Sequence, residues 1–600
     1  MPRTSINIQT YDRKIQNSSE RENRMCKNHI FDYIIIGAGT AGGVIAKKLT
    51  DDKSTSVLAL EPGTNLTKQL SSPSIEVALN LANDNKFSYN ILSKTEQALG
   101  RQLRLAGGRA IGGSSSHNAM YAVRGSRELY NEWGKLVGNQ WSYQNIAPLF
   151  IENETYTGTS QNPNQRGTDG PIFIRQQITP ARGLINTLTQ ATSDVLNIPV
   201  ARDYNTGIRD CTFLKSQFLQ QEVDGGFVRS STATGYLNET IVTQGDQIDS
   251  DEFGADGRKL MILTKTTVNK ILLQKKGEDY VAYGVDFVRN GNCQKAFARK
   301  GIIVAAGVFS PTILQRSGIG KLEDLAAVGV PVLIENEHVG HNLQAHHAVG
   351  MGVEVRTDRL LPILFADPNE PIALGAFKKV NGPGRNIQLI GVPAPLFVPN
   401  QDVLINNWGF NINNLSNVMS FGLVNLNPKN RGEIVIAHSD PEATPTLQFN
   451  PLDNDDDLNF IIDHYIEVYN IVQKAKQLDP AGIYRTVYPN EAIFKLTDEN
   501  EKRSQLANFA KASYISFEHY GGQCKMAKSI QEGVVDGFLN VFGTKNLKVA
   551  DLSVSPILPD GNTTLAAQMI GLNAVKFIQN EQQTHTIQDY EFQFFTDKDE

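Results

Sequence analysis

Three glycines and one carboxylate near the N-terminus have the types and spacing needed to bind a dinucleotide. Gly37, Gly39 and Gly42 form the pattern G-x-G-x-x-G, and Glu61 follows 19 residues after Gly42. The first glycine allows a tight turn, the second lets the backbone approach a pyrophosphate, and the third lets a helix pack closely on a strand. A carboxylate at the position of Glu61 can bind ribose hydroxyls.

The segments around these residues are those that must position them. Residues 34–36 are three isoleucines, which predict a buried strand before the loop that contains Thr40 and Ala41. The glycines then open a helix that ends near residue 49, and a second strand over residues 56–60 leads to Glu61. The N-terminus of such a helix presents unpaired N–H groups and a positive dipole end to phosphates. A glycine-rich turn alone is weak evidence, but this full context favours a dinucleotide site.

Length and composition limit the remaining possibilities. The 600 residues exceed what one core usually supports, so at least two domains are expected. The net charge of −6 argues against a general nucleic-acid binder, and four scattered cysteines form no disulfide framework or metal motif. No apolar run reaches the length of a membrane span, and residues 1–30 contain no apolar core of a secretory signal. We therefore expect a soluble, non-secreted protein.

A second unusual segment covers residues 101–125. It is rich in glycine and serine and contains no acidic residue. We expect a loop rather than a core element here, because such a composition lets backbone N–H groups crowd against a ligand.

Seven segments in a fixed order carry a family resemblance. They read GGRAIGGSSSHNAMYAVRGSRELYNEW from residue 107, DYNTG from 203, GFVRSSTATGYL from 226, GIIVAAGVFSPTILQRSGIG from 301, VGHNLQAHH from 339, HYGGQCKM from 519, and the segment 534–578. Together they resemble the glucose–methanol–choline (GMC) family of flavin oxidoreductases, over about residues 31–580.

The resemblance implies FAD as the cofactor and assigns residues to it. Gly113, Ser114 and Asn118 match the donors to the isoalloxazine ring. His117 matches the residue that choline-oxidising relatives bond covalently to the flavin; the alternative is a neutral histidine packed under the ring. Donors at this place stabilise negative charge on the reduced ring.

Two further positions belong to the expected cofactor site. Val268, in a strand expected over residues 266–273, falls where the family's backbone contacts the adenine. Asp551 ends a short strand over residues 547–550, at a turn where pyrophosphate contacts collect, although a turn or cap role is the alternative. Another strand over residues 301–307 leads to a helix opened by Ser310 as cap and a proline at the first helical position.

The resemblance also assigns the residues that act on a substrate. His519 matches the catalytic histidine, and the pKa of about 6.5 of a free imidazole suits a base for a hydroxyl proton. Asn562 is the nearest candidate for the second catalytic position, where its amide stabilises an alkoxide, while a strict count lands on Thr564. Ala345 and Gln523 depart from the family pattern, which has Asp and Thr there.

The implied fold class is α/β: a Rossmann-like FAD-binding domain, in which helices cover a parallel sheet, and an α+β substrate domain with an antiparallel sheet. We expect the first domain over residues 31–125, 226–345 and 520–580, and the second over 126–225 and 346–519. Residues 1–30 and 581–600 are expected to be peripheral tails, and residues 239–258 an acidic surface insertion.

The sequence therefore predicts an FAD-dependent oxidoreductase that acts on the CH–OH group of a small-molecule alcohol. The base removes the hydroxyl proton, hydride passes to the flavin, and dioxygen or another acceptor reoxidises it, with no need for a metal. Two alternatives remain open: a lyase resembling the family's cyanohydrin-cleaving members, and a non-catalytic flavin-binding structural protein. No partner beyond substrate and acceptor is expected, and neither nucleic acid nor a membrane span.

Overall fold

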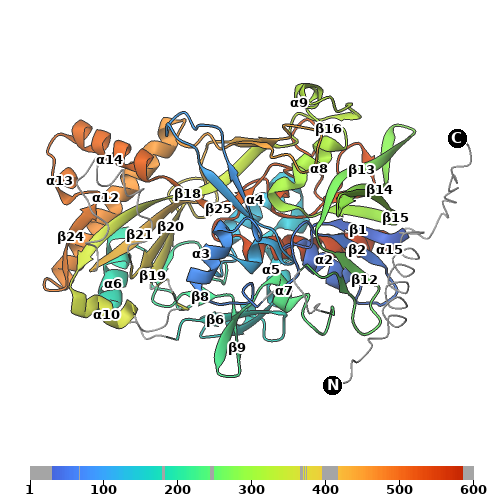
Figure 1. Cartoon of the computed structure of the whole chain (residues 1–600). Coiled ribbons are helices and arrows are strands. Elements are labelled where there is room, and N and C mark those ends of the chain that lie inside the picture. Colours follow the sequence, from blue (N-terminus) through green and yellow to red (C-terminus); the bar gives the residue numbers. More distant parts are fainter. Residues whose placement is uncertain are drawn as a thin grey trace, which may run out of the picture.

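The computed structural model of the chain describes residues 30–66, 68–178, 183–243, 249–364, 369–370, 372, 374–394 and 417–584 (Figure 1). Most of the two expected tails lies outside these residues. Ile30 already belongs to the first strand, and the last helix runs to Thr584. No helix among the described residues combines the length and apolar character that a bilayer span requires.

The first sheet is built around the predicted dinucleotide loop. Its strands are β1 (Ile30–Ile36), β2 (Val57–Leu60), β11 (Glu252–Phe253), β12 (Leu260–Leu263), β13 (Thr266–Lys276), β14 (Asp279–Arg289), β15 (Asn292–Val304), β26 (Thr544–Lys545) and β27 (Leu547–Val549). They follow the order β11-β12-β2-β1-β15-β14-β13, with β26 on β14 and β27 on β15. β1 lies parallel to both β2 and β15, so the expected parallel arrangement is confirmed at the centre of the sheet. The sheet as a whole is mixed, because β14 pairs antiparallel with β15 and β13, and β11 pairs antiparallel with β12.

Helices pack on this sheet where the sequence predicts close approach. α2 (Gly42–Leu49) begins at the third glycine, as expected, and crosses α15 (Thr564–Thr584). The crossing is tight because a Cβ added to Gly571 of α15 would lie 2.9 Å from the carbonyl oxygen of Ala41. The loop over residues 37–42 is thus held between the sheet and the last helix of the structure.

The predicted cap of α8 (Ser310–Arg316) is wrong. Its N-cap is Phe309, and no side chain caps it, although proline does occupy the first turn. The 3₁₀ turn Gly307–Phe309 runs directly into the helix, so the Ser310 hydroxyl is already inside it. That hydroxyl instead donates to the Asp551 carboxylate at 2.5 Å.

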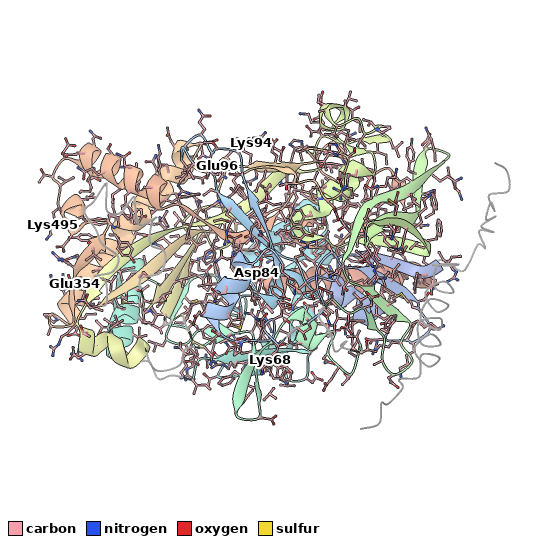
Figure 2. The ribbon with its side chains drawn as sticks, in the orientation of Figure 1. Lys68, Asp84, Lys94, Glu96, Glu354 and Lys495 are labelled. Atoms are coloured by element: carbon pink, nitrogen blue, oxygen red, sulfur yellow. The ribbon has the colours of Figure 1, made fainter. Side chains whose placement is uncertain are left out.

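The glycine- and serine-rich segment is only partly a loop. Residues Arg104–Gly108 form β4, which pairs antiparallel with β3 (Ser88–Leu92), because Leu105 and Ala106 are apolar enough to be buried. The turn of this hairpin carries Lys94 and Glu96, labelled at the top of Figure 2. The Glu96 carboxylate accepts from the backbone N–H of Phe449 at 3.0 Å, which ties the hairpin to the second half of the molecule.

The second sheet is antiparallel, as expected. Its strands are β7 (Cys211–Phe213), β18 (His341–Val355), β19 (Leu374–Lys378), β20 (Ile387–Val392), β21 (Val418–Asn425), β22 (Gly432–Val435), β23 (Thr446–Gln448), β24 (Ile483–Tyr488) and β25 (Ile515–Gly521). The helices α6 (Leu184–Leu196), α12 (Asp455–Leu478) and α14 (Glu499–Ser513) gather beside it, at the left of Figure 1.

Two strands of the second sheet reach toward the dinucleotide loops. β18 crosses the expected boundary at residues 345 and 346, and β25 crosses the one at residues 519 and 520. The two strands pair antiparallel, with His346 opposite His519. The domain division itself stays a prediction, but this pairing places the candidate base beside a second histidine.

Candidate active site

The glycine loop has the geometry that its spacing predicts. Gly37 has a φ of +101°, and a Cβ there would lie 2.6 Å from the carbonyl oxygen of Ala305. A Cβ at Gly42 would lie 1.9 Å from the carbonyl oxygen of Gly37, so only glycine allows this packing. At Gly39 the nearest atom is the Gly113 Cα, 3.6 Å away. Gly39 therefore has space beside it, as a residue facing a ligand should.

Glu61 lies at the mouth of this loop. Its buried carboxylate accepts from the backbone N–H of Ala38 at 3.1 Å and of Gly63 at 2.9 Å. Burial raises the pKa of Glu61 to about 7, against the stabilising effect of these bonds and of the Arg109 charge. A ribose hydroxyl or another donor added at this carboxylate would lower that pKa again.

The two predicted cofactor loops form one unit. Gly113 has a φ of +54°, and a Cβ there would approach the Gly39 Cα to 2.9 Å. The Thr40 hydroxyl donates to the Gly112 carbonyl at 3.2 Å and accepts from the Ser115 N–H at 3.3 Å. Segments more than 70 residues apart in sequence thus present their backbones to the same space.

Asp551 uses its carboxylate to join two turns. One oxygen accepts from the Gly307 N–H at 2.9 Å and from the Ser310 hydroxyl, and the other accepts from the Ser553 N–H at 2.8 Å. Burial raises the pKa of Asp551. The turn role that was the alternative is therefore present, and a pyrophosphate contact stays a prediction. The Val268 carbonyl accepts from Arg316 at 3.2 Å.

His117 and its neighbours line the same region. His117 is buried, and its Nε2 has no hydrogen-bond partner within the described part of the chain. Burial, together with the charge of Arg229, lowers the pKa of His117 to about 4, so the ring is neutral. The Ser114 hydroxyl accepts from the Gly108 N–H at 3.0 Å. Asn118 donates to the Thr564 hydroxyl at 2.7 Å and accepts from Arg229 at 2.8 Å.

A short chain of hydrogen bonds shows which ring nitrogen of His519 can accept a proton. His346 Nε2 lies 3.1 Å from the Leu426 carbonyl, which can only accept, so this nitrogen carries the proton. His346 Nδ1 is then an acceptor for His519 Nδ1–H at 3.1 Å. The remaining nitrogen, His519 Nε2, is left with a lone pair.

Burial keeps this histidine pair neutral. It lowers the pKa of His519 to about 3 and that of His346 well below its usual range. A general base must be unprotonated to act, and His519 meets that condition at any pH near neutrality.

The side-chain amide of Asn562 lies beside the lone pair of His519 Nε2. Its Nδ2 lies 3.3 Å from His519 Nε2, and its Oδ1 accepts from Gln388 Nε2 at 2.9 Å. Gln388, which is fully buried, thereby turns the amide so that its NH₂ faces His519. Thr564, the competing candidate, contacts Asn118 instead. The structure thus brings Asn562, and not Thr564, to the histidine.

Sequence reasoning missed His346 and Gln388. Two adjacent histidines at 346 and 347 were a signal, but they point in different directions. His347 packs between the rings of Tyr514 and Phe449, with centroids 5.0 and 5.5 Å away. Only the register of β18 against β25 decides which of the two meets His519.

The two departures from the family pattern have places in the structure. Ala345 is buried and lies opposite Tyr520 in the pairing of β18 with β25. Gln523 is buried and donates to the Gly307 carbonyl at 3.3 Å, in the turn that also binds Asp551. Ala345 therefore belongs to the core of the second sheet, and Gln523 packs on the turn that binds Asp551.

Two family models match the chain, both described as GMC oxidoreductase. The N-terminal one covers residues 31–348 and the C-terminal one covers residues 428–571. The chain belongs to the GMC oxidoreductase family. The GMC family binds FAD, and its members act on alcohols and related substrates. The resemblance seen in the sequence motifs is thereby confirmed.

Similar proteins extend over almost the whole GMC chain. Pyranose dehydrogenase 3 of Leucoagaricus meleagris is 27% identical over 89% of this chain and 90% of its own length. Oxygen-dependent choline dehydrogenase 1 of Chromohalobacter salexigens is 28% identical over 90% and 93%. The structure of pyridoxine 4-oxidase from Mesorbium loti matches with a TM-score of 0.75 and 22% identity, over 92% of this chain and all of that one (100%). At 22% identity, the similarity to pyridoxine 4-oxidase shows the fold alone.

Proposed function

We propose that this GMC protein is an FAD-dependent oxidoreductase that removes hydride from the CH–OH carbon of a small-molecule alcohol, with His519 as the base. The observation that supports this most directly is the orientation of His519. Its Nδ1 donates to His346, and the lone pair of its Nε2 accepts from the Asn562 amide at 3.3 Å. A lone pair next to an N–H donor is the pair of groups that an alcohol hydroxyl needs when it loses its proton.

The residues present fit FAD. The Gly37–Gly42 loop would hold the pyrophosphate, because Gly39 alone among its glycines has space for a ligand. Glu61 would bind the ribose, Asp551 would support the pyrophosphate turn, and the Gly113–Asn118 segment would lie under the ring. When bound, FAD supplies the two-electron acceptor for hydride.

The side chains at the substrate end divide the remaining work. His519 Nε2 takes the hydroxyl proton, and the His346–Leu426 pair holds the ring in the tautomer that can do so. Asn562 Nδ2 donates to the substrate oxygen as negative charge develops there, in an orientation maintained by Gln388. Dioxygen or another acceptor completes the turnover.

We further propose a covalent bond between His117 and the flavin. The support is an unpartnered, buried Nε2 on a neutral ring, since a neutral imidazole nitrogen is the nucleophilic form. Acid precipitation of the purified protein should leave the flavin with the pellet, and His117→Ala should release it to the supernatant. Free flavin from the wild type would leave the packed, unbonded histidine as the correct interpretation.

Anaerobic mixing with a panel of alcohols tests the main proposal. Bleaching of the oxidised flavin band requires hydride transfer, which neither a lyase nor a structural flavoprotein should show. His519→Ala should lower the rate of reduction by about 10²–10⁴, the usual cost of a lost general base. The exposed His438, replaced by alanine, is the matched control and should leave the rate unchanged. An unchanged rate in His519→Ala would remove the proposed base.

The second catalytic position has its own test. Asn562→Ala should cost about 10²–10³ in the reduction rate if the amide acts like one oxyanion donor. Thr564→Ala should cost much less, because Thr564 contacts Asn118. The reverse order would favour Thr564 as the second catalytic residue.

A further inference from the structure

Among the described residues, Arg229 is a buried cation that forms no ion pair with a carboxylate. It ends β10 (Gly226–Arg229) and is only 1% exposed. Its guanidinium donates to the carbonyl oxygens of Ser72, Ser115 and Asn118 and to the Asn118 side-chain oxygen, at 2.7–3.5 Å. All of these acceptors are neutral. Within the described part of the chain, no carboxylate forms an ion pair with Arg229, and its Nη2 has no partner.

This arrangement is costly for the protein alone. An ion moved from water into a protein interior loses several kcal/mol of solvation unless an opposite charge compensates it. Burial accordingly lowers the pKa of Arg229 to about 9. A cation at such a site is best stabilised by a negative charge that arrives with a ligand or forms during a reaction.

The place of Arg229 indicates which charge that is. Its acceptors Ser115 and Asn118 flank His117, and its charge contributes to the lowered pKa of His117. The guanidinium therefore lies directly behind the segment that we assign to the flavin ring. The Asn118 side chain links the two, because its oxygen accepts from Arg229 and its NH₂ donates to Thr564, which begins α15.

The proposed reaction creates a negative charge at this place. The substrate hydroxyl proton goes to His519 Nε2, and the C–H bond breaks with its electron pair, so that hydride adds to the flavin. A neutral ring that accepts hydride and no further proton carries one negative charge. In a site of low dielectric, a nearby cation stabilises that charge far more than it would in water.

We propose that Arg229 stabilises the negative charge of the reduced flavin and so raises the reduction potential of the bound cofactor. This inference rests on the proposed FAD site at Gly113–Asn118. Arg229 does not touch the substrate and is a positioning and electrostatic residue. The N-terminus of α15 adds its dipole to the same region, but that contribution is common to every Arg229 variant.

The experiment measures the midpoint potential of the holoenzyme in three variants, by equilibration with a reference dye during anaerobic reduction by dithionite. Arg229→Lys keeps the charge, Arg229→Gln keeps a hydrogen-bond donor without charge, and Arg229→Met keeps neither. We expect Lys to stay close to wild type. Gln and Met should shift the equilibrium toward oxidised flavin by about tenfold or more, which is about 30 mV for a two-electron couple.

Arg316→Gln is the matched control. Arg316 is also a largely desolvated arginine that donates to carbonyl oxygens, but these belong to Val268 and Asn269, at the expected adenine end. Its replacement should leave the potential unchanged, because the charge lies far from the ring in the proposed binding mode.

Three results would overturn the inference. Equal potentials in Arg229→Gln, Arg229→Met and wild type would show that the charge does not act on the ring. Loss of FAD from the Lys and Gln variants alike would assign Arg229 a purely structural role. Weaker FAD binding with an unchanged potential would assign the charge to the diphosphate. If the wild-type protein binds no FAD, the proposed function fails first, and this outcome is separate from the other three.

Discussion

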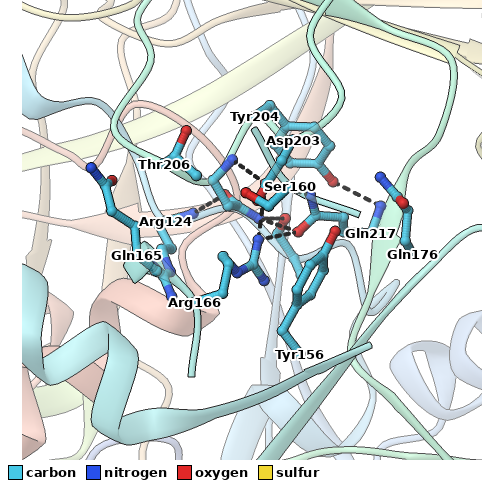
Figure 3. Close-up of polar contacts among 12 residues, drawn as sticks. Arg124, Tyr156, Ser160, Gln165, Arg166, Gln176, Asp203, Tyr204, Thr206 and Gln217 are labelled. Atoms are coloured by element: carbon cyan, nitrogen blue, oxygen red, sulfur yellow. Dashed lines mark hydrogen bonds and ion pairs between the residues drawn. The ribbon is translucent and has the colours of Figure 1, made fainter. Parts of the chain in front are cut away.

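Two sites with buried arginines differ in how the protein balances their charge. In the first, Arg166 binds Glu154 at 2.6 Å and Asp203 at 2.9 Å, and Arg124 binds the same Glu154 at 2.6 Å. Figure 3 shows Arg124, Arg166 and Asp203 of this site. All four side chains are at most 3% exposed. In the second, Arg229 is equally buried, and within the described residues its hydrogen bonds go to neutral oxygens.

The two sites differ in whether the protein alone balances the buried charge. The balanced cluster pairs two cations with two anions from different segments of the chain, so its charges are balanced without a ligand. Gln217 and the Asn205 N–H donate to the same Asp203 oxygen, Oδ1, while Asp203 Oδ2 and Arg124 Nε have no hydrogen-bond partner among the described residues. Arg229 has no such compensation and lies behind the proposed flavin segment. A buried charge that the protein leaves unbalanced is therefore the better indicator of a site.

The largest expected effect comes from breaking the balanced cluster. Arg166→Met removes the cation that Glu154 and Asp203 share and leaves both carboxylates buried. This loss should cost about 3–5 kcal/mol of stability. Urea unfolding followed by the fluorescence of the buried Trp133 and Trp141 measures this. The exposed pair Lys135–Glu132, broken by Lys135→Met, is the control and should cost at most about 1 kcal/mol. Equal costs would mean that burial of the Arg166 cluster is energetically unimportant.

His464 shows a third solution, in which a buried group avoids charge by losing its proton. His464 is 6% exposed and stacks on Phe460. Burial lowers its pKa to about 4, and the charge of Lys378 also lowers it, whereas the charges of Glu467 and Asp463 raise it. Below pH 6.5 the unfolded chain binds a proton here that the folded protein does not bind. Stability therefore falls on acidification, and between pH 7 and pH 5 this one group removes about 2 kcal/mol.

His464→Leu should remove that contribution. The difference in unfolding free energy between wild type and variant is measured at pH 7 and at pH 5. Over this interval the variant should lose about 2 kcal/mol less stability than wild type. Parallel pH profiles would show that His464 is already protonated in the folded protein.

Arg229→Met should have a smaller effect on stability than Arg166→Met. The lost hydrogen bonds to carbonyl oxygens are offset by removal of a desolvated charge, so the net cost in the protein with oxidised flavin should be about 1 kcal/mol. The same urea experiment gives this value. A cost as large as that of Arg166→Met would show that Arg229 has a compensating partner after all.

The smallest effect is expected at a half-buried pair. Glu433 and Asp324 raise the pKa of His341, and the Asp324 carboxylate lies 2.8 Å from His341 Nε2. The folded protein therefore holds this proton more tightly than the unfolded chain, and the resulting stability is present below pH 6.5 and disappears as pH rises through the folded pKa. Asp324→Asn should lower the pKa of His341, followed by NMR titration, and cost about 0.2–1 kcal/mol below pH 6. An unchanged titration would contradict the pairing.

Much of the fold could be predicted because its signals are local. The glycines at 37 and 42 and the isoleucines before them predict a strand, a turn and a helix, and these formed as expected. The Ser310 cap and the loop over 104–108 were predicted wrongly because a neighbouring turn and a neighbouring strand decided them. A cap or an edge strand depends on what packs beside it, and that partner is not visible in a short window of sequence.

The sequence by itself determined the family, the order of the cofactor segments and the identity of His519 and Asn562 as candidates. Only the tertiary structure decided which neighbours orient these two candidates. The register of β18 on β25 brings His346, and not His347, to His519, and the Leu426 carbonyl then sets which nitrogen keeps a lone pair. Likewise, the absence of a carboxylate beside Arg229 among the described residues appears only after folding. The physical reason is that hydrogen-bond partners and burial are properties of three-dimensional neighbours, which residue type and spacing do not specify.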